Sequence, residues 1–137
     1  MASLAAKDVM IKKLVRVSPE TTLTAAARLM VRRDVGSVLV MRGNRLIGIL
    51  TKSDFVRIAP KTEVPNKVKE VMSAPVITCG PDKTVLEIIH LMQKNRIRHV
   101  PITDGDRVVG IVTDYDLACY ATSQLNKVLT MIKPPKA

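Results

Sequence analysis

The sequence predicts an α/β (α+β) fold in which two repeats of element order β-α-β-β-α pack against each other with pseudo-two-fold symmetry. The main observation is an internal repeat: the heptapeptide GILTKSD at Gly48–Asp54 returns as GIVTDYD at Gly110–Asp116, 62 positions later. Each copy also has one stretch with helical apolar spacing and two short apolar runs around a glycine turn. A solenoid needs three or more units, so two copies predict two half-domains that pack together.

Each repeat opens with a short helical turn and a brief extended piece. The turn ends at Val9–Met10 in the first copy and at Val71–Met72 in the second. Extended residues follow at Leu14–Val17 and at Val76–Cys79. A proline two residues later interrupts the extended conformation in both copies.

The first long helix of each repeat begins after a threonine. Thr22 and Thr84 stand where a helix N-cap belongs, and apolar residues then recur at spacings of three and four. This spacing places one apolar stripe on each helix. The apolar residues are Leu23, Ala26, Ala27 and Met30 in the first copy, and Val85, Ile88, Ile89 and Met92 in the second.

Two short strands around a tight polar turn come next. They are Val38–Met41 and Leu46–Leu50 in the first copy, and His99–Ile102 and Arg107–Val112 in the second. A glycine in each turn supplies the positive φ that such turns need. A second helix closes each repeat, and in the second copy we expect it to run toward Met131.

These elements divide the chain into four parts. We expect the first repeat at 6–59, a linker rich in proline and polar residues at 60–66, the second repeat at 67–122, and a helix extension with a disordered tail at 123–137. The length of 137 residues suits one domain, and 47% hydrophobic residues provide a core.

The composition limits the class of partner. Phe55, Tyr115 and Tyr120 are the only aromatic residues, which argues against single-stranded nucleic-acid or sugar binding through stacked rings. The net charge of +10 favours anionic partners in general. Phosphorylated small molecules, nucleic acids and anionic membrane surfaces all meet this condition.

The two cysteines, Cys79 and Cys119, have no metal-type spacing and do not recur with the repeat. We interpret both as small buried hydrophobic residues, and the lack of a disulfide framework suggests a reducing cytoplasm. No apolar run is long enough to span a membrane, and the first ten residues do not have the pattern of a signal peptide.

The repeated T-x-x-D motif lies at the start of each closing helix. One interpretation of Thr51 with Asp54, and of Thr113 with Asp116, is a capping box that satisfies the helix end. The other is ligand binding, because a helix N-terminus favours phosphate and a carboxylate one turn later can accept hydrogen bonds from both ribose hydroxyls. The recurrence at the same place in both repeats favours the second interpretation.

The doubled pattern of a V-M opening, a two-strand unit and G-h-h-T-x-x-D (h, a hydrophobic residue) resembles a pair of cystathionine-β-synthase (CBS) domains over residues 6–122. This resemblance implies a regulatory module that binds AMP, ADP, ATP or S-adenosylmethionine in two clefts between the repeats, with no obligatory cofactor. It also implies a homodimer, whose interface would be formed by apolar helix faces left over after intrachain packing.

The resemblance implies two sets of binding residues. In cleft A, Thr51, Ser53 and Asp54 would hold phosphate and ribose, with Val76, Ile77, Thr78 and Ile97 around the adenine and His99 near the phosphates. In cleft B, Thr113, Tyr115 and Asp116 would take the sugar and phosphate, Val15, Arg16, Val35 and Gly36 would surround the base, and Lys13 and Arg98 would lie near the phosphates.

The cations near these clefts are unevenly supplied. Alternation along a strand sends Arg98 and His99 to opposite sides, one toward each cleft. The matching segment of the first repeat, Asp34–Ser37, contributes no positive charge, so we expect unequal affinities. His99 is as compatible with a solvated or core position as with a ligand contact. His90 is expected at the surface or an interface, and no metal site is expected.

Catalytic motifs are missing from the sequence. It contains no P-loop, no G-x-G-x-x-G and no nucleophile elbow, so we do not expect an enzyme or any catalytic residue. Two alternatives to a nucleotide sensor stay open. One is a basic nucleic-acid-binding protein that contacts mainly phosphates, and the other is a scaffold that docks partners with its clefts empty.

Overall fold

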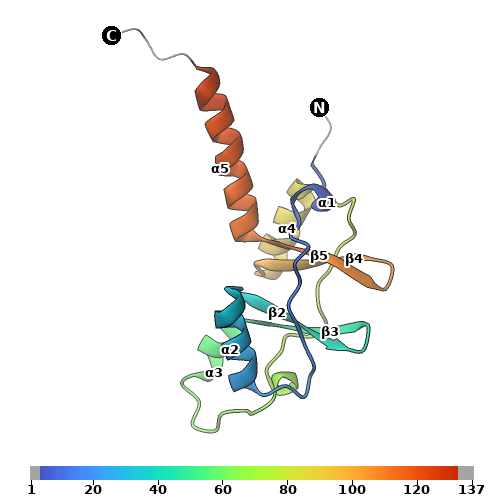
Figure 1. The fold of residues 1–137 in the computed structure, drawn as a ribbon, viewed down its shortest axis with the longest axis vertical. Helices are drawn as coiled ribbons and strands as arrows, with labels where there is room; N and C mark the ends of the chain where they lie inside the picture. The colour runs from blue at the N-terminus through green and yellow to red at the C-terminus, as the bar shows by residue number, and fades with distance from the viewer. Residues whose placement is uncertain (1–3, 133–137) are drawn as a thin grey trace.

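The computed structural model describes residues 4–132, and its elements follow the expected order in two halves, with α5 projecting from the second (Figure 1). The helices are α1 (Ala6–Val9), α2 (Leu23–Arg33), α3 (Lys52–Ile58), the 3-10 helix η1 (Val68–Glu70), α4 (Val85–Asn95) and α5 (Asp114–Met131). The strands are β1 (Arg16–Val17), β2 (Ser37–Arg42), β3 (Arg45–Thr51), β4 (His99–Asp104) and β5 (Arg107–Thr113).

Local sequence signals account for most of these boundaries. The hydroxyl oxygen of Thr22 accepts a hydrogen bond from the first turn of α2, and that of Thr84 does the same for α4, as predicted. The hairpin turns place Gly43 at φ 62° and Gly105 at φ 61°, where a glycine is favoured.

The two repeats differ in their first strand. In the first, β1 pairs in parallel with β2, and the N–H of Leu39 donates to the carbonyl of Val15 (2.9 Å). The prediction of an equivalent strand at Val76–Cys79 is wrong, because only Cys79 forms a bridge to β4. Proline occupies position 101, which corresponds to Leu39, and it has no N–H to make the equivalent bond.

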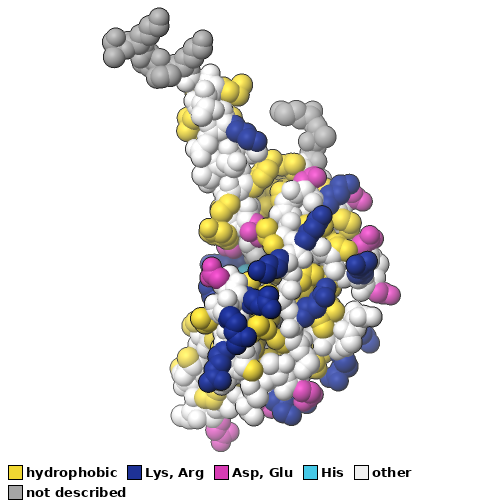
Figure 2. All heavy atoms as spheres, viewed as in Figure 1, with side chains coloured by type: hydrophobic (Ala, Val, Ile, Leu, Met, Phe, Trp, Pro, Cys, Tyr) yellow, Lys and Arg dark blue, Asp and Glu magenta, His cyan; other side chains and the backbone are white. Residues whose placement is uncertain are grey.

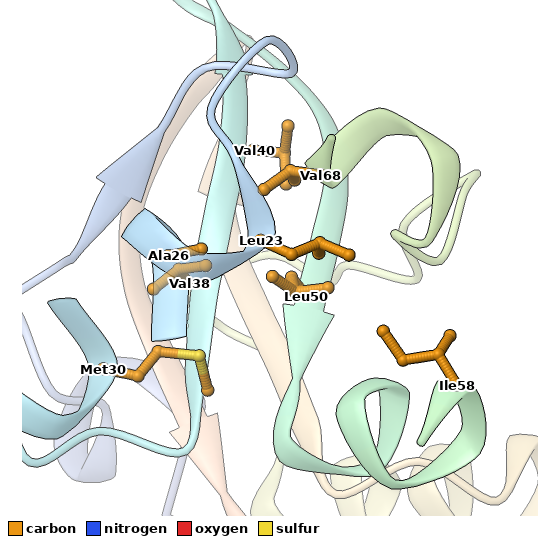
Figure 3. Close-up of a cluster of buried hydrophobic side chains, with 8 residues drawn as sticks. All are labelled: Leu23, Ala26, Met30, Val38, Val40, Leu50, Ile58 and Val68. Carbon is orange, nitrogen blue, oxygen red and sulfur yellow. The ribbon is translucent and has the colours of Figure 1, made fainter. Parts of the chain in front are cut away.

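Each half has its own core, and a third cluster joins them. Figure 3 shows the first core, where α2, β2, β3, α3 and η1 converge. The second core gathers α1, α4, β4 and β5 in the same way. Between the two sheets, Leu39 and Ile49 of the first half pack with Val108 and Ile111 of the second. The halves are therefore held together by apolar contact between their sheets.

The repeats also exchange their opening segments. Ala6, on α1, is fully buried in the second core, and the N–H and carbonyl of Ile11 pair with those of Ile111 at 2.9 and 3.0 Å. In the same way Val68, on η1, is fully buried in the first core. The core of each half therefore includes a residue from the opening turn of the other repeat. Neither repeat could complete its own core without the other.

The structure corrects the expectation for one cysteine. Cys119 is exposed on α5, whereas Cys79 is half-buried and its burial raises the pKa of its thiol. The helix that begins after Thr113 extends to Met131 as predicted, but the expected disordered tail at 133–137 lies outside the described residues. No helix in the described part of the chain has the length and apolarity needed to cross a bilayer.

Candidate functional site

The candidate residues centre on two strand-to-helix junctions, β3 to α3 and β5 to α5. The first N–H of α3, from Lys52, donates to the carbonyl of Gly36 at 3.1 Å. The first N–H of α5, from Asp114, donates to the carbonyl of Arg98 at 3.0 Å. Arg98 therefore lies beside the junction of cleft B, to which the sequence assigned it. Gly36, also assigned to cleft B, lies instead beside the junction that carries the cleft A residues Thr51 and Asp54.

At the first junction, the carboxylate of Asp54 is engaged by its own helix. Only 1% of the residue is exposed. Its Oδ2 accepts from the Thr51 N–H at 2.8 Å and from the Thr51 hydroxyl at 3.4 Å, and its Oδ1 accepts from Arg57 Nη1 at 2.8 Å. These contacts match the capping interpretation, and a ribose would have to displace some of them.

The carboxylate at the second junction is less occupied. The Thr113 hydroxyl accepts from the N–H of Asp116 at 3.1 Å and donates to its Oδ2 at 2.7 Å. Within residues 4–132, Oδ1 of Asp116 has no hydrogen-bond partner, and the side chain is only half-buried. Asp116 can therefore accept further hydrogen bonds without losing those it has.

His99 lies between the two repeats. A β-carbon built on Gly36 would be 3.3 Å from Cε1 of His99 and 4.0 Å from Cε of Lys52, so all three residues meet in one place. Nδ1 of His99 is buried and has no hydrogen-bond partner in the described part of the chain. The residue assigned to cleft A thus touches a residue assigned to cleft B.

The charges around His99 come from both repeats. Burial lowers the pKa of its imidazole most, while the carboxylates of Asp114 and Asp116 raise it and the cations of Arg98 and Lys52 lower it. A half-buried imidazole with a lowered pKa is favoured in its neutral form. Neutral imidazole can donate or accept one hydrogen bond at each nitrogen, depending on its tautomer.

The start of α5 also faces the first repeat. Tyr115 is 73% exposed. The side chain of Cys119, one turn further along the helix, raises the pKa of the Tyr115 phenol most, and the carboxylates of Asp116 and Asp34 raise it further. Asp34 ends α2 in the first repeat, so the C-terminal end of α2 lies close enough to the β5–α5 junction to affect its electrostatics.

The apolar residues predicted to surround a base are divided among three clusters. Val15 and Val35 pack against the first core, Ile97 packs against the second, and Val76 packs against the cluster between the sheets. All four keep part of their surface exposed. Among the other predicted residues, Lys13, Arg16 and Ser53 are exposed, and Ile77 and Thr78 are half-buried.

The backbone N–H and carbonyl of Arg16 are placed to form hydrogen bonds with the edge of a planar ligand. β1 is at the edge of its sheet, and its register with β2 opposes Arg16 to Leu39. In a parallel ladder of this register, the flanking residues Val15 and Val17 bond to β2, and the N–H and carbonyl of Arg16 point away from it. Those two groups are a donor and an acceptor side by side.

The sequence reasoning did not select Lys52 and Asp114, which the structure places near His99. Both residues occupy the position directly after the motif threonine, so the repeat itself was the signal that could have found them. Arg98 and Asp114 also form a long ion pair of 3.9 Å on the surface. Asp114 therefore reduces the positive charge that Arg98 offers to a phosphate.

Cavities in the structure lie beside the helices. One of about 990 Å³ lies between α2, α3 and the linker and is lined by residues that include Val31, Phe55 and Val64. A smaller one of about 460 Å³ lies between α4 and α5, where Ile97 and Arg98 meet Asp114. Within residues 4–132, no three His, Cys, Asp or Glu side chains gather where a metal ion could be held.

The fold and the two junctions define a tandem-repeat module whose candidate site residues come from both repeats. A family model described as CBS domain matches residues 6–61 and 68–122. The chain therefore belongs to the CBS domain family and carries two such domains in tandem, as the sequence pattern indicated.

Among curated relatives, the CBS domain-containing protein YhcV of Bacillus subtilis (strain 168) is 35% identical over 114 residues, which cover 82% of this chain and 81% of that protein. An inosine-5'-monophosphate dehydrogenase of Methanocaldococcus jannaschii is also 35% identical over 114 residues, which cover 82% of this chain but only 22% of the enzyme. Most of the other relatives are likewise much longer than this chain.

Solved structures agree with the fold. The CBS domain protein NE2398 superposes with a TM-score of 0.82 at 28% identity, covering 88% of this chain and 99% of that one. The CBS domain pair of MJ0100, solved in complex with 5'-methylthioadenosine and S-adenosyl-L-methionine, gives a TM-score of 0.83 at 25% identity, covering 90% and 99%. A CBS pair of this kind is a regulatory module.

Proposed function

We propose that this chain regulates by binding an adenosyl ligand (AMP, ADP, ATP or S-adenosylmethionine) and that cleft B is its principal site. The observation that carries the proposal is the half-buried Asp116, whose Oδ1 has no partner within residues 4–132. A carboxylate in this position can accept both ribose hydroxyls. The adenosyl ligands bound by the MJ0100 pair support the same ligand class.

The rest of cleft B supplies complementary chemistry. The hydroxyl of Thr113 and the N-terminus of α5, with about half a positive charge, favour a phosphate or another anionic group. The exposed Lys13 and Arg98 add mobile cations. The open backbone of Arg16 would bond the edge of the adenine, and Val35 would contact its face.

Cleft A is proposed as the weaker site. Its carboxylate, Asp54, already accepts three hydrogen bonds, one of them from Arg57. The groups that could pair with a phosphate there are Lys52 and His99, and burial lowers the pKa of His99, which disfavours its cationic form. Binding there would have to exchange existing bonds for new ones, so the net gain in free energy would be smaller.

The test is a thermal melt of the full chain with AMP, ADP, ATP, S-adenosylmethionine and, as a control, GMP. Ligand at about 100 times its Kd stabilises the folded state by about 2.7 kcal/mol, which is a readily measured shift in Tm. Asp116→Ala should remove most of that shift, and Asp54→Ala should keep most of it. Asp106→Ala, in the exposed β4–β5 turn, is the matched control and should leave the shift intact.

An adenosyl-induced shift that survives in a chain carrying both Asp54→Ala and Asp116→Ala would show that the ribose assignment is wrong. A shift that is lost with Asp54→Ala alone would reverse the proposed order of the two clefts. Circular dichroism of each variant without ligand separates lost binding from lost folding.

Nucleic-acid binding is the second candidate, because the chain has a net charge of +10 and Figure 2 shows Lys and Arg side chains spread over one face of both halves. Such binding would depend on phosphate contacts, so its affinity should fall steeply with salt. An oligonucleotide that binds at low salt, in a protein whose Tm no mononucleotide changes, would favour this candidate.

We further infer that the chain is non-catalytic, acts in the cytoplasm and assembles as a homodimer. The two cysteines are free, which suits a reducing compartment. Exposed apolar residues on α5, such as Leu125 at 57% and Val128 at 54%, support self-association. Sedimentation of the purified protein tests the dimer independently of any ligand.

A further inference from the structure

The helix α5 leaves the body of the protein after its first turns (Figure 1). It has 18 residues, none of which is buried in the described structure, and its base packs against α1, β5 and the second core. A helix in a protein takes most of its stability from tertiary packing of one face, and a projecting stretch shorter than about 12–15 residues is marginal in water by itself. The C-terminal half of α5 therefore needs a further packing partner to be stable as a helix.

An apolar stripe runs along this helix. Ala118, Ala121, Leu125 and Val128 follow one another at spacings of three, four and three residues, and Ile132, directly after the last helical residue, continues the spacing. This alternation is the pattern of a helix that packs along another helix. The large apolar residues at its end (Leu125, Val128, Leu129, Met131 and Ile132) are all between 54% and 80% exposed.

The charge of the helix indicates what kind of partner fits. Lys127 is the only charged residue from Leu117 to Ile132, in a chain whose net charge is +10. The side opposite the stripe carries uncharged polar residues, among them Ser123 and Asn126. An anionic membrane or an acidic protein would need a cationic polar face, so the complement of α5 is a neutral, apolar helix.

We propose that the apolar stripe of α5 packs against the same stripe of a second copy. A second copy of α5 has both properties that a partner needs. It carries an apolar stripe with the same spacing of three and four residues, and it has little charge that would repel the first copy. A two-fold pair matches one surface patch with itself, and homodimer interfaces are more apolar than ordinary surface. This proposal names the surface of the homodimer inferred above and rests on that part of the proposed function.

The test measures sedimentation of the full chain over a dilution series. Leu125→Glu combined with Val128→Glu should weaken the dimer at least about tenfold. The matched control is Ser123→Glu combined with Asn126→Glu, which adds the same charge to the opposite side of the same helix and should leave the dimer intact. The helical signal in circular dichroism should fall when the wild type is diluted to monomer.

A second control is Val31→Glu on α2, which should also leave the dimer intact. A monomeric wild type, a dimer that resists the stripe variant, or equal loss with the polar-side variant would each overturn the proposal. Dissociation by Val31→Glu would also overturn it, because the partner of α5 would then be the α2 face. The adenosyl-induced shift in Tm, measured on the same variants, separates failure of this surface from failure of ligand binding.

Discussion

The side chain of Met72 occupies the space that a β-carbon on Gly48 would need. A β-carbon built on Gly48 would lie 2.9 Å from Cγ of Met72 and would also collide with its sulfur. The second repeat has the mirrored contact, in which a β-carbon on Gly110 would be 2.7 Å from Cγ of Met10. Gly48 and Gly110 therefore each leave room for the methionine of the other repeat's V-M pair, Met72 and Met10 respectively.

Gly48→Ala should destabilise the fold by about 1–3 kcal/mol, the usual cost of overpacking a well-filled site. The same change in a Met72→Ala background should cost less than half as much, because the colliding side chain is gone. Gly80→Ala is the control, since its β-carbon would be 3.9 Å from its nearest neighbour. Urea unfolding of the four variants gives the coupling, and independent effects at positions 48 and 72 would contradict the contact.

Asp54→Ala should lower the free energy of unfolding by about 1–3 kcal/mol, because it leaves the N–H of Thr51 without its acceptor. Asp106→Ala, on the exposed β4–β5 turn, should change it by less than about 0.5 kcal/mol. Chemical unfolding without ligand measures both values. Equal, small effects would show that Asp54 does not stabilise the start of α3. Its carboxylate would then be as available to a ligand as that of Asp116.

The stability of the protein should fall as the pH decreases through 6.5. Burial lowers the pKa of His99 in the folded state below its ordinary value of 6.5. Between these two pKa values the unfolded chain binds more protons than the folded one, so the free energy of unfolding rises with pH in that window. His99→Gln should flatten this dependence, whereas His90→Gln, which removes an exposed histidine, should keep it. Equal slopes in all three proteins, measured by urea unfolding at several pH values, would contradict the assignment.

Ala6→Leu should destabilise the protein by about 1–3 kcal/mol, because Ala6 is fully buried in the core of the second half. Ala25→Leu, on the exposed side of α2, is the matched control and should have little effect. Thermal unfolding measures both. Tolerance of leucine at position 6 would mean that the opening turn of the first repeat does not pack into the second half.

Signals within a few residues of each other made much of the fold predictable. Thr22 and Thr84 cap their helices, and Gly43 and Gly105 turn their hairpins, because each needs only neighbours along the chain. The extended piece at Val76–Cys79 was mispredicted, since a strand needs a donor from the opposite strand and position 101 provides none. Burial of Cys119 was also mispredicted, because Cys119 lies on α5, none of whose residues is buried.

The candidate site shows the same division. The repeat pointed to Thr113 and Asp116, but it also pointed equally to Thr51 and Asp54. Only the structure distinguishes the two carboxylates, through the partners that surround each one. Likewise no local pattern could place His99 against Gly36, since the contact joins residues of different repeats.

The sequence by itself determined that two like units follow one another, where each helix and hairpin turns, and which side chains stand at the helix starts. These properties depend on hydrogen bonds and apolar spacing between near neighbours. The tertiary structure decided that the two units exchange their opening turns. It also decided that both oxygens of Asp54 accept hydrogen bonds within the protein, whereas Oδ1 of Asp116 accepts none within residues 4–132. The exchange depends on contacts between residues far apart in the sequence, such as Ile11 with Ile111, and the closure of the first junction depends on Arg57, which lies outside the repeated motif.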